Sequence, residues 1–309
     1  MSAGIGLWSV PVAILGGALQ VSPPFLFVSL GECVTEKSGR INLGLEGTLV
    51  FGAMSGYAGS YLTGSPWLGV LIAACGGMML GLLHGPICSL RGVNDIAVGI
   101  AMMLLGMGLA FFFGKPFIQP AAPMLHAINF GWWSHVPQVR QALQICPLFP
   151  LGIGIAVLLT WMFRQTKIGL VLRMVGDSAD AARAMGYGIL RVRITATAFG
   201  GFMAGIGGAY LSLFYPGSWN EGISSGQGLI AVALVIFARW KPLACLGAAL
   251  IFGGAGAIGP ALQSVGVGAG YYLFYAAPYV LTLIILIATS SRHGALEGAP
   301  RELSITKSR

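Results

Sequence analysis

Polar residues that could do chemistry are rare in this chain, and one group of them falls in residues 31–47. This segment, GECVTEKSGRINLGLEG, interrupts long apolar runs with Glu32, Glu36, Lys37, Arg40, Asn42 and Glu46. Ionisable groups in apolar surroundings are costly and usually face a cavity or each other. Asn42 and Glu46 stand one helical turn apart, so a helix there would point both the same way. The segment predicts either a polar substrate path at a broken helix, lined by Glu32, Asn42 and Glu46, or a charged turn in which Glu36 and Arg40 form an i,i+4 pair.

A second group of charges lies in residues 164–193, RQTKIGLVLRMVGDSADAARAMGYGILRVR. It contains eight charged residues, six of them basic, between long runs that carry no charge. A charged segment between apolar spans must lie in water, and its basic excess predicts the cytoplasmic side. A short helix is expected from about Ser178 to Met185, with Asp180 and Arg183 at i,i+3. Such a helix would suit docking to a soluble partner, although an ordinary cytoplasmic loop explains the same spacing.

Other chemical patterns are weak or absent. Residues 222–226 match G-x-S-x-G, but this pattern needs a strand–turn–helix elbow and a positioned base, and no His/Asp partner is apparent for Ser224. A glycine turn or a polar gate lining is the better interpretation of the loop that holds Ser224, Ser225 and Gln227. Asp95 is expected to cap the helix that it begins. No phosphate-binding loop or zinc-site spacing occurs, so the sequence predicts no metal, no cofactor and no catalysis in this chain.

The composition is that of an integral membrane protein. Apolar residues make up 56% of the 309 residues and charged residues only 8%, whereas a soluble domain has about 25% charge. The formal net charge of +8 does not indicate nucleic-acid binding, because the basic residues stand singly at the ends of apolar spans, where they anchor helices. The five cysteines show no spacing typical of a metal site, and their odd number argues against a disulfide framework.

The apolar runs predict an all-α polytopic bundle of about nine (8–10) transmembrane helices in a single domain, 1–309. The expected spans are 8–30, 42–63, 66–90, 94–114, 147–163, 194–215, 227–239, 243–263 and 269–290. Prolines 23 and 24 are expected to kink or split the first. With 164–193 inside, all but Lys115 and Arg140 of the 17 basic residues fall in the cytoplasm. The connector 115–146 is then external and the tail 291–309 cytoplasmic.

Glycine is abundant, with 48 residues, and small-xxx-small pairs recur. Such pairs let helix backbones approach closely in lipid. We therefore expect close helix packing at Gly52/Gly56, Gly77/Gly81, Gly81/Gly85, Gly201/Gly205 and Gly266/Gly270.

Four segments, in order, resemble one family. GECVTEKSGRINLGLEG is similar to the N-terminal signature of permease subunits of ABC importers for nucleosides and simple sugars, a superfamily that includes the ribose and branched-chain amino-acid permeases. RMVGDSADAARAMGYGILRVRITATAFGGFMAGIGGAYLS resembles their cytoplasmic coupling segment and the glycine-rich span after it, and residues 92–109 and 228–253 also fit. The likeness covers most of residues 25–290. Arg40 departs from the pattern, since an apolar residue is commoner there.

The resemblance implies a non-catalytic importer subunit of the bacterial plasma (inner) membrane that forms the path for a nucleoside or simple sugar. Its partners would be an ATP-binding ABC subunit that hydrolyses ATP, a second permease subunit, identical or homologous, an external substrate-binding protein and membrane lipid. Carried over by position, Gly176, Asp177, Ala182 and Gly186 would lie in the coupling helix, together with Asp180 and Arg183 of the helix expected from spacing. Closure of the ATPases would push this helix and tilt the bundle.

Two other functions fit the residues. An ion-coupled secondary transporter would work alone and use Glu32, Glu36 or Glu46 as a proton carrier. An intramembrane hydrolase would be built on Ser224. Between nucleoside and sugar, the EKSGRINLGLEG form resembles the nucleoside branch more closely.

Overall fold

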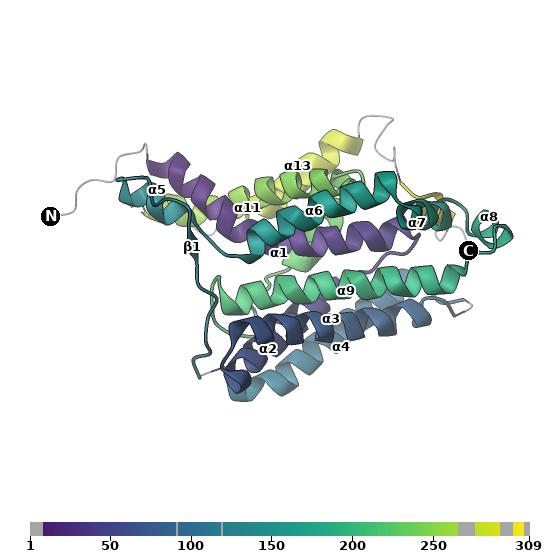
Figure 1. The fold of residues 1–309 in the computed structure, drawn as a ribbon, viewed down its shortest axis with the longest axis horizontal. Coiled ribbons are helices and arrows are strands. Elements are labelled where there is room, and N and C mark those ends of the chain that lie inside the picture. Colours follow the sequence, from purple (N-terminus) through teal and green to yellow (C-terminus); the bar gives the residue numbers. More distant parts are fainter. Residues whose placement is uncertain (1–8, 91, 119, 265–275, 291–298, 306–309) are drawn as a thin grey trace.

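The computed structural model describes residues 9–90, 92–118, 120–264, 276–290 and 299–305, and within these ranges the chain is a bundle of roughly parallel and antiparallel helices (Figure 1). The long helices are α1 (Ser9–Lys37), α2 (Leu45–Thr63), α3 (Pro66–Ile87), α4 (Asp95–Gly114), α6 (Leu148–Gln165), α9 (Ile189–Leu213) and α11 (Pro242–Ser264). Shorter helices are η1 (Lys115–Phe117), α5 (Pro137–Ala142), α7 (Lys167–Asp177), α8 (Ala179–Ala184), α10 (Gln227–Phe237), α13 (Ala277–Ser290) and α14 (Arg301–Ile305).

Six of the described helices are long and apolar enough to cross a membrane: α1, α3, α4, α6, α9 and α11. Helices α2, α10 and α13 occupy the other three spans expected from the sequence, and α10 is a shorter apolar helix of 11 residues. The helical, polytopic character is therefore borne out, whereas the count of about nine spans stays a prediction. Part of the expected span 269–290 lies outside the described residues.

The helices form two layers that meet along α1 and α9 (Figure 1). Helices α2, α3, α4 and α9 make one layer, and α1, α6, α11 and α13 make the other. Helices α7 and α8 lie at one end of the bundle, and α5 and strand β1 (Ile128–Asn129) lie at the opposite end. We refer to these as the α8 end and the α5 end.

Helix α1 continues through Pro23 and Pro24 and ends only at Lys37, so it is bent rather than split (Figure 1). A proline removes one helical hydrogen bond and bends the axis without ending the helix when neighbouring helices support it. The consequence is that Glu32 and Glu36 lie in the last turns of a membrane helix. The sequence placed both in a segment between two spans.

Glycine brings α3 and α9 into backbone contact. A methyl group on Gly77 would overlap the carbonyl oxygen of Gly201, and one on Gly201 would overlap that of Gly77. One turn along, Gly81 meets the carbonyl of Thr197 in the same way. The expected close packing at these glycines is confirmed, while the pair Gly266/Gly270 lies outside the described residues.

The connector folds over the α5 end of α2 and α9. The Tyr57 hydroxyl donates to the carbonyl oxygen of Pro120 at 2.8 Å, and the Ser60 hydroxyl donates to that of Pro123 at 2.6 Å. The Leu125 amide donates to the carbonyl of Leu213 at 3.0 Å. A two-residue antiparallel ladder pairs β1 with β2 (Gln144–Ile145). The connector thus fixes the end of α9, from which the loop to α10 departs.

Candidate functional site

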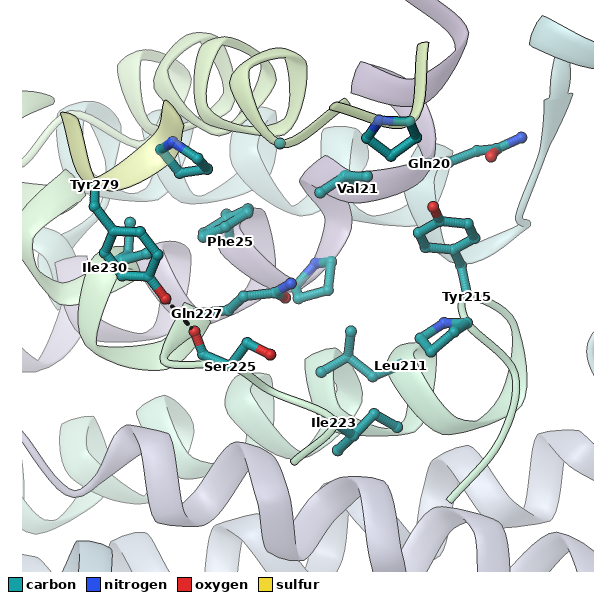
Figure 2. Close-up of a pocket in the computed structure, with 15 residues that line it drawn as sticks. Gln20, Val21, Phe25, Leu211, Tyr215, Ile223, Ser225, Gln227, Ile230 and Tyr279 are labelled. Atoms are coloured by element: carbon teal, nitrogen blue, oxygen red, sulfur yellow. Dashed lines mark hydrogen bonds between the residues drawn. The ribbon is translucent and has the colours of Figure 1, made fainter. Parts of the chain in front are cut away.

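A cavity of about 330 Å³ opens between the two layers toward the α5 end. Its walls come from α1, the end of α9, the loop to α10, and helices α10, α11 and α13 (Figure 2). The lining residues are Gln20, Val21, Pro24, Phe25, Leu211, Tyr215, Pro216, Ile223, Ser225, Gln227, Ile230, Gly256, Pro260, Pro278 and Tyr279. Four of them are prolines, which bend or end the helices around the hollow.

Five of the described lining residues have polar side chains, Gln20, Tyr215, Ser225, Gln227 and Tyr279, although the amide of Gln20 extends away from the hollow (Figure 2). The Tyr279 hydroxyl donates to the carbonyl oxygen of Ser225 at 2.6 Å, which closes one side (Figure 2). The Ser225 hydroxyl donates to the carbonyl of Gly222 at 3.2 Å. Gln227 extends into the middle of the cavity, and its Oε1 is buried with no hydrogen-bond partner among the described residues (Figure 2).

Glu46, one of the three residues predicted to line a substrate path, instead holds the start of α10. Its carboxylate is buried and accepts four hydrogen bonds, from the Ser224 hydroxyl at 2.6 Å and from the backbone amides of Gly226 at 3.1 Å, Gly228 at 2.6 Å and Leu229 at 3.3 Å. A negative charge at a helix N-terminus satisfies its free amides and complements its dipole. Glu46 thereby fixes the loop that carries the lining residues Ser225 and Gln227.

Glu32 and Asn42 lie together at the α8 end of α1. Glu32 is fully buried, and its Oε1 accepts the backbone amide of Asn42 at 2.7 Å. The other oxygen, Oε2, has no partner among the described residues. The Asn42 side chain accepts the Gly44 amide at 2.9 Å. Because α2 begins only at Leu45, the expectation that Asn42 and Glu46 share one helical face is wrong.

Glu32, Asn42 and Glu46 are all outside the wall of the cavity, although Glu46 accepts the amides of Gly226 and Gly228, which flank the lining residue Gln227. Their role in a substrate path stays a prediction. Sequence patterns did indicate two lining side chains, since Ser225 and Gln227 belong to the loop that was interpreted as a possible gate lining. Gln20, Tyr215 and Tyr279 were missed, because nothing in an apolar run distinguishes a residue beside a hollow from one facing lipid.

Two local interpretations of the charged residues are corrected by their partners. Arg40 forms an ion pair with Asp95 at 2.7 Å rather than with Glu36, because α1 ends before Arg40 and the side chain turns toward α4. The Glu36 carboxylate accepts the indole N–H of Trp240. Asn94, not Asp95, caps α4, its side chain accepting the Ile96 amide at 2.8 Å.

Ser224 has no arrangement for nucleophilic catalysis among the described residues. Its hydroxyl donates to Glu46, and its neighbours are a glycine turn and the start of a helix, without the strand that a nucleophile elbow requires. His84 lies on α3 beside Cys88, with its Nε2 3.3 Å from that sulfur. No cluster of His, Cys, Asp and Glu that could hold a metal occurs within the described ranges.

The charged segment 164–193 forms two short helices at the α8 end. Thr166 caps α7 by accepting the Gly169 amide at 3.2 Å, and Ser178 caps α8 by accepting the Ala181 amide at 3.2 Å. The expected ion pair between Asp180 and Arg183 is present at 3.0 Å and faces solvent. Helix α8 projects beyond the other helices (Figure 1).

The six residues predicted to couple this segment to a partner divide into two groups. Asp177, Asp180, Arg183 and Gly186 are exposed, as is every residue from 183 to 188. Gly176 and Ala182 are buried: a methyl group on Gly176 would overlap the carbonyl of Lys37, and Ala182 has no exposed surface. The exposed group can touch a partner, whereas the buried pair sets the position of α7 and α8 against the bundle.

A residue of the tail, Glu302, links α8 to α9. Its Oε1 accepts the amide of Ala179, the first residue of α8, at 3.0 Å, and its Oε2 accepts Nη2 of Arg193 at 3.2 Å. Arg193 also donates from Nε to the carbonyl oxygen of Ser38 at 3.2 Å. No sequence pattern indicated this link, because Glu302 and Ala179 are separated by 123 residues.

Comparison with known proteins identifies a family and several relatives. The family model described as branched-chain amino acid transport system / permease component matches residues 13–290. A protein of Haloferax volcanii named "Putative glucose ABC transporter permease protein TsgC13" is 33% identical over 250 residues, 79% of this chain and 76% of that protein. The nucleoside ABC transporter permease protein NupC of Lactococcus lactis is 28% identical over 88% of this chain and 90% of its own length. The guanosine ABC transporter permease protein NupQ of Bacillus subtilis is 26% identical over 91% of this chain and 93% of its own length.

Proposed function

Because this chain belongs to the branched-chain amino acid transport system / permease component family of ABC transporter permeases, we propose that it is moved by a separate ATPase to import a nucleoside or a simple sugar. It is a multi-pass protein of the bacterial inner membrane and a non-catalytic transport subunit. The proposed assembly adds an ATP-binding subunit on the α8 side, a second permease subunit and an external substrate-binding protein that delivers the cargo.

The observation that carries the proposal is the exposed helix α8. Asp180 and Arg183 present charges to solvent, and Met185, Tyr187 and Leu190 leave apolar surface exposed beside them. Exposed apolar side chains next to charged ones are typical of a protein–protein contact. Its position on a segment with six basic residues favours the cytoplasm, where an ATP-binding subunit would be.

The links behind α8 suggest how its movement would reach the bundle. Glu302 bonds both the first residue of α8 and Arg193 on α9, and Arg193 bonds the end of α1 at Ser38. Gly176 places α7 directly against α1. A push on α8 would therefore act on α1 and α9, the two helices along which the layers meet.

A charge reversal on the exposed segment tests the proposal. Asp177→Arg should reduce recovery of the ATP-binding subunit on the purified permease about tenfold, because it adds repulsion and bulk at the end of α7 while membrane insertion continues. Glu221→Arg is the matched control, since it makes the same change on an exposed residue of the loop between α9 and α10. Equal recovery with both variants would contradict docking at this segment. ATP-dependent uptake by reconstituted vesicles gives the activity itself.

A second candidate, an ion-coupled transporter, is favoured by Glu32, a fully buried carboxylate with one oxygen unpartnered among the described residues. A buried carboxyl group of this kind can exchange a proton. Reconstitution separates the two functions. Uptake that needs the ATPase and continues without a proton gradient supports the importer. Uptake without the ATPase that stops when the gradient collapses supports the secondary transporter.

A further inference from the structure

We propose that the cavity between α1, α9, α10, α11 and α13 binds the base of a neutral nucleoside, and that Gln227 reads the edge of that base. This inference rests on the proposed importer function and narrows its substrate from nucleoside or sugar to nucleoside. It does not involve Glu32, Asn42 and Glu46, the residues predicted to line a substrate path, because all three lie outside the cavity wall.

The size and charge of the cavity exclude several classes of cargo. Its volume of about 330 Å³ is at the lower end of the range of about 300–1,000 Å³ for small-molecule sites, so it suits one nucleoside or one monosaccharide. None of the described residues that line it carries a charged side chain. A buried charge without a partner is strongly unfavourable. Nucleotides, with their phosphates, and zwitterionic amino acids therefore do not fit.

The balance of polar and apolar groups separates a nucleoside from a sugar. A monosaccharide carries a hydroxyl group on almost every carbon, and each one loses free energy if it is buried without a hydrogen-bond partner. Among the described residues, the wall of the cavity includes five with polar side chains, and the hydroxyl protons of Ser225 and Tyr279 are already donated to backbone carbonyls. The rest of the wall is apolar, including the ring of Phe25 and four prolines. A flat heterocycle buries well against such a surface.

Gln227 supplies the specific contact. Its amide has one acceptor oxygen and two donor hydrogens, a set that forms paired hydrogen bonds with the edge of a base, as glutamine does with adenine in DNA recognition. The buried Oε1 lacks a partner among the described residues and extends toward the centre of the cavity (Figure 2). Glu46 fixes the backbone on both sides of Gln227, through the amides of Gly226 and Gly228. The amide is therefore presented from a rigid position.

The rim of the cavity provides an entrance. Tyr279 and Tyr215 are 48% and 37% exposed, and Ser225 is exposed as well. The two tyrosines stand on opposite sides of the cavity in Figure 2, with Tyr279 beside Ile230 and Tyr215 beside Gln20. In the proposed assembly this rim faces the external binding protein, because it lies toward the α5 end, opposite the proposed docking helix α8. The ribose of a bound nucleoside would then remain at the exposed rim, where water can hydrogen-bond its hydroxyl groups.

Photolabelling of the full-length chain in membranes tests the proposal directly. 8-Azidoadenosine should label peptides that contain residues 20–25, 211–230, 256–260 or 278–279, and adenosine, guanosine or uridine should compete, whereas glucose and AMP should not. Gln227→Leu should reduce labelling about tenfold. Gln165→Leu is the matched control, because Gln165 is exposed at the end of α6, far from the cavity. Both variants must elute from size exclusion like the wild type.

The outcomes separate this proposal from the function on which it rests. Competition by glucose as strong as by nucleosides, or labelling unchanged in Gln227→Leu, would overturn the assignment of the cavity. Absence of labelling here in a chain whose reconstituted assembly imports nucleosides with ATP would overturn it too, while leaving the importer intact. If the assembly fails to import any nucleoside or sugar with ATP, the importer function itself fails.

Discussion

The interface between α3 and α9 and the interface between α1 and α11 both use glycine, yet one is closed and the other opens into a cavity. On α3 and α9, Gly77 and Gly201 bring two backbones into direct contact. On α11, a methyl group on Gly253 would lie 2.8 Å from the backbone of Ser22 on α1, a close but looser approach; one turn further, a methyl group on Gly256 would meet Cγ1 of Val21 at 3.2 Å and Cγ of Pro278 at 3.9 Å. Beyond that point the neighbours are the cavity and its prolines.

The difference shows that the residues facing a glycine on the neighbouring helix decide whether the two helices pack closely there. In lipid, small residues allow close approach only if the facing helix is straight and also small at that level. Pro24 and Pro260 bend the backbone on the two helices at the level of the cavity, and Pro278 lies at the start of α13. The closed interface can hold its layer rigid, whereas the open one leaves room for cargo.

The largest expected effect is that of Gly201→Leu in the closed interface. A leucine side chain would be forced into the carbonyl of Gly77, where backbone cannot move aside. The loss of folding stability should exceed that of ordinary overpacking, which is about 1–3 kcal/mol. Fluorescence-detected size exclusion should therefore show no peak of folded protein. The control is Gly154→Leu, since Gly154 on α6 has open space around it. A folded Gly201→Leu variant would show that α3 and α9 do not pack as described.

Gly256→Leu should abolish binding and leave folding intact, which is the sharpest contrast with Gly201→Leu. The new side chain would project into the cavity and take the volume of the base, so labelling by 8-azidoadenosine should fall more than tenfold, equivalent to a loss of more than about 1.4 kcal/mol of binding free energy. The midpoint of thermal unfolding in detergent should change by only a few degrees. Gly247→Leu on the same helix is the matched control, because no other part of the described chain lies within 4 Å of its added methyl group. Full labelling of Gly256→Leu would contradict a site here.

The closed interface could be predicted from sequence and the open one could not, for a physical reason. Spacing of four between glycines reports directly on helix contact, so Gly77/Gly81 and Gly201/Gly205 were found. The cavity is built from separate segments, and in a membrane helix the faces toward lipid and toward the bundle are both apolar. Periodicity therefore gives no signal for Gln20 or Tyr279.

For charged residues too, the sequence predicts local contacts and gives no signal for contacts between distant segments. The helix around Asp180 and Arg183 was predictable because its ion pair is local, at i,i+3. Glu46 was noticed as a carboxylate in apolar surroundings, but its partners at Ser224 to Leu229 lie about 180 residues away in the chain. The sequence could identify which groups need a partner and could not say which partner they have.

Tyr279→Phe should have a moderate effect confined to the open interface. It removes the hydrogen bond from the tyrosine hydroxyl to the carbonyl of Ser225, which is 2.6 Å long and lies at the exposed rim. A net loss of about 0.5–1.5 kcal/mol is expected, which should weaken nucleoside competition in the labelling assay about two- to tenfold. Tyr61→Phe serves as the control, because Tyr61 is exposed on α2, away from the cavity. An equal loss in both variants would mean that the rim hydrogen bond has no part in binding.

The smallest expected effect is that of Gly154→Ala. It tests the comparison of the two interfaces at a glycine that no neighbouring helix in the described part of the chain approaches. Gly154 stands within α6, and no atom of the described chain lies within 4 Å of the position of an added methyl group. Alanine is favoured over glycine in a helix by about 1 kcal/mol, so the unfolding midpoint of the isolated chain should rise slightly. The same measurement on Gly201→Ala should give a clear fall, because even one methyl group overlaps the facing backbone there. If both substitutions shifted the midpoint in the same direction, the surroundings of a glycine would not decide its effect, and the contrast between the two interfaces would fail.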